Sequence, residues 1–89
     1  MNIVWKGQFK KDYKRAKKQG KNLADLRSVI ETLAKRQPLS PPKNRHHGLF
    51  GSWNKHRECH ITPDWLLIYR IDGEDLILER TGSHSELFG

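Results

Sequence analysis

The 89-residue sequence predicts one α+β domain over residues 1–89, with two N-terminal helices packed on one face of a mostly antiparallel sheet. Three observations support this prediction. Apolar residues recur at helical spacing in residues 8–19 and 23–36, and short apolar or alternating segments follow in residues 52–81. An Asp-Gly pair at residues 72–73 is a strong hairpin signal between two of those segments. The predicted order of elements is β-α-α-β-β-β.

The first strand is expected over residues 2–6 and the first helix over residues 8–19. Gly20 ends this helix, because glycine readily adopts the left-handed conformation that closes many helices. A spacing of i, i+4 and i+7 gives the helix a narrow apolar stripe, and lysine and arginine cover most of its remaining surface. The stripe consists of Phe9, Tyr13 and Ala16.

The second helix is expected over residues 23–36. Asn22 precedes it as the N-cap, because its side chain can accept a hydrogen bond from the first turn. Pro38 ends it, since proline cannot continue a helix. The link between the two helices is very short, which predicts an antiparallel pair. The buried face of the second helix is expected to consist of Leu23, Leu26, Ile30 and Leu33.

The second half of the chain is expected to form the sheet. Residues 38–51, with three prolines and two glycines, are predicted to be a loop. In residues 52–61 polar and apolar side chains alternate in part, which predicts a polar strand. The continuous apolar run at residues 65–71 is typical of a central strand buried on both sides. Residues 75–81 form the next strand after the hairpin, and residues 82–88 a short tail with a turn of helix.

Charge is unevenly spread along the chain, whose formal net charge is +7. Residues 1–45 hold 13 Lys+Arg and 3 Asp+Glu, whereas residues 46–89 hold 4 and 7. The basic run from Lys10 to Lys21 favours binding to nucleic acid or to an acidic protein, with a merely solvated helix surface as the alternative.

The cysteine content and the hydropathy pattern bear on location. Cys59 is the single cysteine, so no intrachain disulfide can form and a reducing compartment is expected. No apolar run approaches the roughly 20 residues of a membrane span, and the N-terminus has no signal-peptide core. We therefore expect a cytoplasmic protein that does not bind membranes.

A metal site is not expected from the spacing of the candidate ligands. Cys59 and His60 are consecutive on a strand and point to opposite faces. His56 and His60 share a face, but they lie about 13 Å apart along an extended strand. The sequence therefore predicts no metal and no other cofactor.

Proton transfer is the chemistry that the polar residues favour. Cleaving RNA without a metal needs a base for the 2′-hydroxyl, an acid for the departing 5′-oxygen and cations for the phosphate. Imidazole can take or give a proton near neutral pH. From composition and spacing alone, both a ribonuclease and a non-catalytic nucleic-acid-binding module remain open, and Asp64 after Pro63 could be only a turn residue. The candidates are His47, His60, His84 and Asp64 for protons, and Lys43, Arg45 and Arg80 for phosphate.

Several segments resemble one family of bacterial toxins. The segments are Gly51-Ser52-Trp53, the run from His60 to Tyr69 that contains H-x-x-P-D-W, the run Glu79 to His84 that contains R-T-G-S-H, and the ending Leu87-Phe88-Gly89. Together they are similar to the YafQ branch of the RelE-like toxins, and the likeness covers nearly the whole chain. The resemblance implies a RelE-like fold, which agrees with the predicted order of elements.

The resemblance also implies an activity and a set of site residues. Members of this family are metal-independent endoribonucleases of type II toxin–antitoxin pairs that cut mRNA at the ribosome and inhibit translation. They leave a 2′,3′-cyclic phosphate, or its 3′-phosphate, and a 5′-hydroxyl. The catalytic residues implied here are His47, His60, Asp64, His84 and Phe88. The substrate-binding residues are Lys43, Arg45, His46, Trp65 and Arg80, with His46 the alternative to its neighbour for the first catalytic position.

The partners follow from the same resemblance. They are a cognate antitoxin with an acidic C-terminal segment, the ribosomal RNA and the mRNA, with operator DNA bound only through the antitoxin. Two alternatives stay open: a non-catalytic nucleic-acid-binding module, and a degenerate toxin that only binds its antitoxin.

Overall fold

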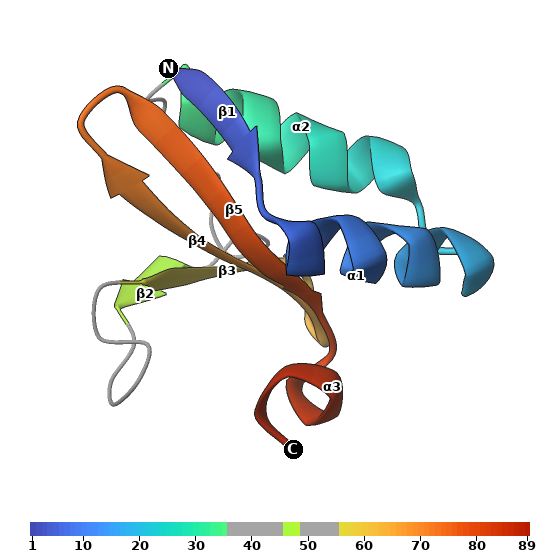
Figure 1. The fold of residues 1–89 in the computed structure, drawn as a ribbon. Coiled ribbons are helices and arrows are strands. Elements are labelled where there is room, and N and C mark those ends of the chain that lie inside the picture. The colour runs from blue at the N-terminus through green and yellow to red at the C-terminus, as the bar shows by residue number, and fades with distance from the viewer. Residues whose placement is uncertain (36–45, 49–55) are drawn as a thin grey trace.

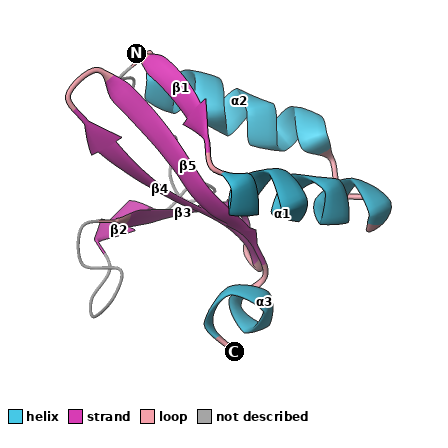
Figure 2. Ribbon diagram, viewed as in Figure 1, coloured by secondary structure: helices cyan, strands magenta, loops and turns pink. Residues whose placement is uncertain are grey.

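The computed structural model describes residues 1–35, 46–48 and 56–89, and of residues 46–48 it describes the backbone alone. These residues form an α+β fold in which two helices lie on one side of a sheet and a third, short helix lies at its end (Figures 1 and 2). In chain order the elements are β1 (Asn2–Trp5), α1 (Gly7–Lys18), α2 (Leu23–Ala34), β2 (His46–Gly48), β3 (Arg57–Thr62), β4 (Trp65–Asp72), β5 (Asp75–Gly82) and α3 (His84–Phe88).

The described strands form one five-stranded sheet in the order β1-β5-β4-β3-β2. Three of the four pairings are antiparallel, and only β1 runs parallel to its neighbour β5. The prediction of a mostly antiparallel sheet with two N-terminal helices is confirmed. The hairpin between β4 and β5 is also confirmed, although its two connecting residues are Gly73 and Glu74, with φ of +60° at the glycine.

The prediction of a single loop over residues 38–51 is wrong where it includes β2. His46–Gly48 pairs with Arg57–Cys59 of β3 and adds an edge strand to the sheet. Three residues are too few to show an alternation of polar and apolar side chains. The strand can therefore be recognised only from its pairing with β3, and not from its own sequence. The other residues of that expected loop, and residues 52–55 of the expected third strand, lie outside the described residues.

Both long helices begin and end near the predicted residues. Gly20 follows α1 with φ of +73°, and the amides of Gly20 and Lys21 donate to the carbonyls of Lys17 and Ala16, which is a Schellman closure. Asn22 caps α2 by accepting a hydrogen bond from the Ala24 amide at 3.0 Å. The two helices run in opposite directions across the same side of the sheet, as the short link predicted (Figure 1). None of the helices in the described part of the chain is long and apolar enough to cross a membrane.

The core lies on both sides of the central strand β4. Trp65, Leu67 and Tyr69 pack with the apolar faces of α1 and α2. Leu66 and Ile68 point to the other side, where they pack with Leu87 of α3. Residues 65–69 are buried, so the prediction from the apolar run is confirmed for them, whereas Arg70 is partly exposed and Ile71 is exposed.

The tail forms the short helix α3, which has its own cap. The Ser83 hydroxyl accepts from the Glu86 amide, and the Glu86 carboxylate accepts from the Ser83 amide at 2.8 Å, so the two residues form a capping box. Leu87 anchors the helix by burying its side chain on the sheet. Burial of one leucine stabilises such a contact by about 1.5–3 kcal/mol.

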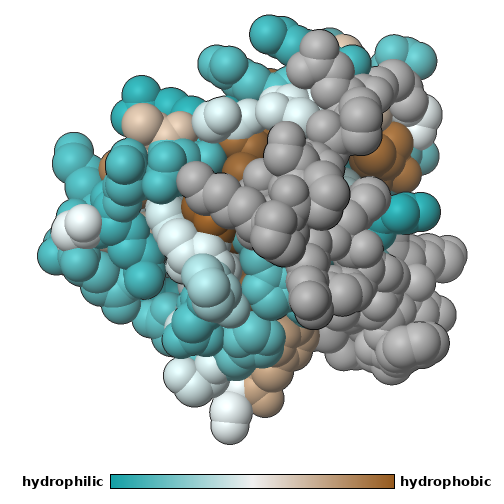
Figure 3. Space-filling model, turned by 180° about the vertical axis from the view of Figure 1, so that it is seen from behind, coloured by the Kyte–Doolittle hydropathy of each residue, from teal (hydrophilic) through white to brown (hydrophobic). Residues whose placement is uncertain are grey.

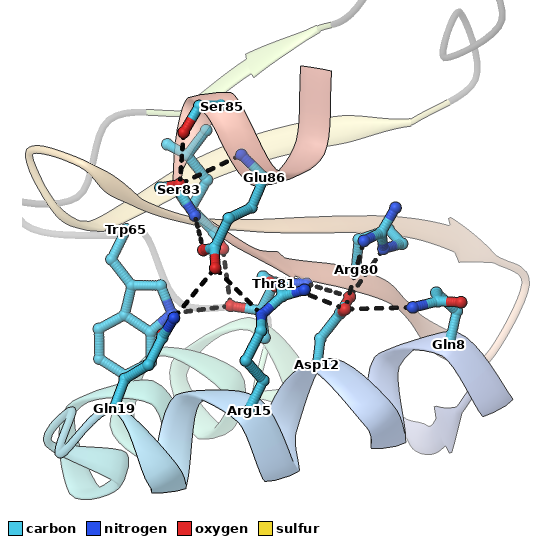
Figure 4. A network of polar contacts seen from close by, with 11 residues as sticks. Gln8, Asp12, Arg15, Gln19, Trp65, Arg80, Thr81, Ser83, Ser85 and Glu86 are labelled. Carbon is cyan, nitrogen blue, oxygen red and sulfur yellow. Dashed lines mark hydrogen bonds and ion pairs between the residues drawn. The ribbon is translucent and has the colours of Figure 1, made fainter. Parts of the chain in front are cut away.

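Asp12 is the charged side chain that α1 buries. It is 1% exposed, which is rare for a carboxylate unless it is paired. Arg80 of β5 donates to it from Nε at 2.7 Å and from Nη2 at 3.2 Å, and the Thr81 amide donates at 3.2 Å. Gln8 donates at 3.2 Å, and Arg15 forms an ion pair with the same carboxylate at 3.4 Å (Figure 4). One carboxylate thus connects α1 to the C-terminal part of β5.

Asp12→Ala is predicted to lower the free energy of unfolding by about 2–4 kcal/mol, because it leaves the Arg80 guanidinium and the Thr81 amide without their buried acceptor. Urea unfolding monitored by circular dichroism measures the change. Asp72→Ala is the control, since Asp72 is 75% exposed and lies 3.7 Å from Arg70. Exposed pairs of this kind contribute about 0–1 kcal/mol. If both variants lost the same free energy of unfolding, the structural role given to the Asp12 carboxylate would be contradicted.

Candidate functional site

The site begins where the β3–β4 turn meets the tail. Asp64 lies in the turn, and Oδ1 of its carboxylate contacts Nδ1 of His84 at 3.0 Å. The backbone amide of His84 donates to the same oxygen at 3.3 Å. The turn therefore holds the first residue of α3 through both its side chain and its backbone, and these two residues are called the Asp64–His84 pair below.

The Asp64–His84 pair has an electrostatic consequence for the carboxylate. Hydrogen bonds from the His84 side chain and backbone lower the pKa of Asp64 below its ordinary value, and the positive charges of His84 and Lys21 add to this effect. Asp64 therefore stays ionised throughout the range in which an imidazole titrates. An ionised carboxylate at Nδ1 fixes the tautomer of His84 with its proton on that nitrogen, and Nε2 is then available for proton exchange.

A second carboxylate–imidazole pair lies on β3. Nε2 of His60 contacts Oε1 of Glu58 at 3.2 Å, and Nδ1 of His60 contacts the carbonyl of Pro63 at 3.3 Å. Glu58 and His60 are two residues apart on one strand, so their side chains leave the same face of the sheet. Both side chains are mostly buried, in contrast to the exposed Asp64–His84 pair.

The two pairs are neighbours. The ring centroids of His60 and His84 lie 5.8 Å apart, and those of His84 and Phe88 lie 6.4 Å apart. Phe88 is 45% exposed, which is high for a large apolar side chain. The structure thus brings His60, Asp64, His84 and Phe88 together, although the sequence separates them by up to 28 positions.

Glu58 is the site residue that the sequence analysis missed. It lies within the polar strand segment that was predicted, two residues before His60. A same-face spacing of i, i+2 was the signal that could have identified it. The spacing alone is unspecific, because alternating polar residues on a half-exposed strand are common.

Some predicted residues lie beyond the described part of the chain. Lys43 and Arg45 lie outside the described residues, so the structure says nothing of their expected contact with phosphate. For His46 and His47 the backbone alone is described. The register of β2 and β3 places His47 opposite Glu58 and His46 opposite Cys59.

Two other predicted substrate contacts have structural roles. Trp65 is 2% exposed, and its indole N–H donates to the Thr81 hydroxyl at 2.9 Å. The ring of Trp65 therefore lies in the core, and its contact with substrate stays a prediction. Arg80 is part-buried and binds Asp12 through two of its nitrogens. Its guanidinium has five N–H groups, so the Asp12 pair does not use all of its donors.

Three of the described side chains could hold a metal ion. Each of them offers one ligand atom, and these three atoms lie within 4.8 Å of one another; the residues are Glu58, His60 and His84. Two imidazoles and a carboxylate suit transition metals such as zinc or copper. The prediction of no metal site rested on spacing along one strand, whereas His84 reaches this strand from the tail.

Comparison with known proteins gives consistent matches over the whole chain. The family model described as the bacterial toxin YafQ of type II toxin–antitoxin systems matches residues 1–89. The mRNA interferase toxin YafQ of Escherichia coli strain K12 is 39% identical over 88 residues, covering 99% of this chain and 96% of that protein.

Solved structures agree with this match. A copper-bound mutant toxin from Helicobacter pylori superposes with a TM-score of 0.93 at 43% identity, covering 99% of both chains. YafQ in the E. coli DinJ–YafQ complex superposes with a TM-score of 0.90 at 39% identity, covering 99% of this chain and 98% of that one. The predicted resemblance is confirmed, and the chain belongs to the YafQ family of toxins of type II toxin–antitoxin systems.

Proposed function

We propose that this toxin is an mRNA endoribonuclease that acts at the ribosome in the cytoplasm by general acid–base catalysis. The observation that carries the proposal is the meeting of two carboxylate–imidazole pairs, Glu58–His60 and Asp64–His84, whose rings lie 5.8 Å apart. One of these imidazoles can transfer a proton to or from the reacting oxygens, while the other lies close enough to support the charge on the same phosphate. The similarity to an mRNA interferase over 99% of the chain supports the choice of substrate.

The reaction needs two proton transfers. A base removes the proton of the 2′-hydroxyl, whose oxygen attacks the adjacent phosphorus, and an acid protonates the 5′-oxygen as its bond to phosphorus breaks. The products are a 2′,3′-cyclic phosphate and a 5′-hydroxyl. His84 serves as one of these groups through Nε2, with its tautomer fixed by Asp64. His47 is proposed as the other, and its register position opposite Glu58 favours it over His46.

His60 is proposed to support the phosphate charge. Its two ring nitrogens face a carboxylate and a backbone carbonyl, both of which only accept hydrogen bonds. The doubly protonated form of the ring can donate to both of these acceptors. A positive ring beside the scissile phosphate stabilises the extra negative charge of the transition state.

The surface of the toxin suits polar partners. In the view of Figure 3 the described surface is mostly hydrophilic, with only small apolar areas. Lysines and arginines cover the exposed side of α1. We propose that this basic surface binds ribosomal RNA during cleavage and the acidic C-terminal segment of a cognate antitoxin otherwise, and that operator DNA is bound only through that antitoxin. The E. coli relative has been solved with its antitoxin DinJ.

His84→Ala and Asp64→Ala are predicted to lower the rate of mRNA cleavage in a translation extract. For His84→Ala we expect a loss of about 10²–10⁴-fold, the usual contribution of one positioned acid or base. The loss in Asp64→Ala should be smaller, because this residue orients the imidazole. His56→Gln is the matched control, since its imidazole pairs with Glu79 at 3.3 Å and belongs to neither pair. Full activity in both site variants, with folding verified by circular dichroism, would contradict the proposal.

The pH dependence of kcat/KM is predicted to be bell-shaped, because one imidazole must be neutral and another charged. Single-turnover cleavage between pH 5 and 9 measures it. The fall in kcat/KM on the acidic side of this profile should not come from Asp64. Hydrogen bonds from His84 hold the pKa of its carboxyl below the ordinary range, so the carboxyl is already ionised at pH 5. A flat profile with chemistry rate-limiting would exclude the two-imidazole scheme.

Divalent transition metals are predicted to inhibit the enzyme. An ion on Glu58, His60 and His84 would bind the imidazole of His84, which must exchange a proton, and that of His60, which supports the phosphate charge. Cleavage should therefore persist in EDTA, fall on addition of Cu²⁺ or Zn²⁺ and return with excess chelator. Glu58→Gln should raise the metal concentration that gives half inhibition. Loss of cleavage in EDTA, restored by metal, would instead indicate metal-dependent catalysis.

A further inference from the structure

The position of the proposed catalytic tail depends on contacts that α3 makes with the rest of the domain. α3 has five residues and carries both His84 and Phe88. Isolated helices shorter than about 12–15 residues are marginal in water. The capping box between Ser83 and Glu86 is internal to the tail, so it shapes the helix without locating it. Leu87 fixes only the apolar side of α3 on the sheet.

Besides the contact of His84 with Asp64, α3 makes polar contacts with α1. Nε of Arg15 pairs with Oε2 of Glu86 at 3.1 Å, and Gln19 donates to the same oxygen at 3.0 Å. Nη2 of Arg15 donates to the carbonyl of Thr81 at 3.3 Å. The same guanidinium also pairs with buried Asp12, so its own position is fixed from two sides (Figure 4). We call the Arg15–Glu86 pair the clasp.

Gly82 provides the space for the clasp. A Cβ atom added at this residue would lie 2.9 Å from Nη2 of Arg15 and 3.1 Å from Oε1 of Glu86. The positive-φ glycines are Gly20, Gly73 and Gly89, so Gly82 is required here for room and not for its backbone conformation. A methyl group at this residue would force the Arg15 guanidinium and the Glu86 carboxylate to shift from their present positions without removing a charge.

We propose that the clasp across Gly82 positions His84 on Asp64, which makes Arg15 and Glu86 positioning residues of the toxin. Glu86 links α1 to the start of α3. One oxygen of its carboxylate pairs with Arg15 of α1, and the other accepts a hydrogen bond from the amide of Ser83, the residue before His84. Neither residue is among the contacts of the Asp64–His84 pair. The catalytic consequence rests on the function proposed above, whereas the placement of α3 can be tested without it.

Two variants test the clasp, Arg15→Gln and Gly82→Ala, and the first readout is the titration of Asp64 in the free toxin. If α3 shifts, Asp64 loses its hydrogen bonds from His84, and the pKa of its carboxyl should rise toward the ordinary value. NMR of the side-chain carboxyl carbon measures this pKa. Hydrogen bonds from His84 are the main cause of the lowered pKa, so a displaced imidazole should be visible in this titration.

Lys14→Gln is the charge-matched control for that titration. Lys14 is an exposed neighbour of Arg15 on α1, and its replacement removes the same charge. The pKa of Asp64 should stay lowered in this variant. Gly82→Ala provides the complementary case, because it disturbs the clasp at unchanged charge. Amide hydrogen exchange of α1 and β5 verifies that both variants keep the fold.

The second readout is single-turnover cleavage at saturating mRNA–ribosome complex. We expect the rate to fall about 10–100-fold in Arg15→Gln and Gly82→Ala, since a misplacement of roughly 1 Å costs that much. The complex concentration at half-maximal rate should change far less in Gly82→Ala, which keeps every charge of the binding surface.

The outcomes separate the two proposals. A pKa of Asp64 that stays lowered in both Arg15→Gln and Gly82→Ala would overturn the clasp as a positioning device, whatever the cleavage assays give. A raised pKa in both variants supports it. A raised pKa together with a wild-type toxin that cuts no mRNA would refute the proposed function and leave the positioning of α3 established.

Discussion

The buried carboxylate of Asp12 is the constraint on which the arrangement of this molecule depends. It lies in the apolar interface between α1 and the sheet, where an unpaired charge would be strongly unfavourable. Arg80 and the amide of Thr81 compensate it from β5, and Arg15 compensates it from the next turn of its own helix. The carboxylate therefore fixes the register between α1 and the end of β5, and the tail leaves the sheet from that end.

The site is built on this junction. β5 ends at Gly82, and α3 begins at His84, so any change in how β5 meets α1 is passed directly to the tail. The turn before β4 lies beside the same end of the sheet and supplies Asp64. The partly buried Glu58–His60 pair and the exposed Asp64–His84 pair then meet at the surface. One imidazole is held by protein groups at both nitrogens, whereas the other is free to exchange a proton with a substrate through Nε2.

The open character of the site agrees with the large substrate that we propose. The imidazole of His84 and the ring of Phe88 are each about half exposed, at 52% and 45%. In the proposed reaction the ribosome would hold the mRNA strand and supply the other wall of the site, so no deep cavity is needed. Proton transfer in such a site depends on the geometry of a few side chains, so a contact that fixes a five-residue helix has a large effect on rate.

The sequence by itself determined the order of the longer elements, the helix caps at Gly20 and Asn22, the central strand and the family, but not the edge strand β2, because helical and strand periodicity, capping and short motifs are local properties. It also identified His60, Asp64 and His84 as candidates. It could not identify Glu58 or the possible metal ligands, because those depend on His84 crossing from the tail to β3. Only the tertiary structure showed that Asp12 is buried and that Gly82 makes room for an ion pair. These features depend on which side chains meet across long sequence separations, and that information is absent from any short stretch of the chain.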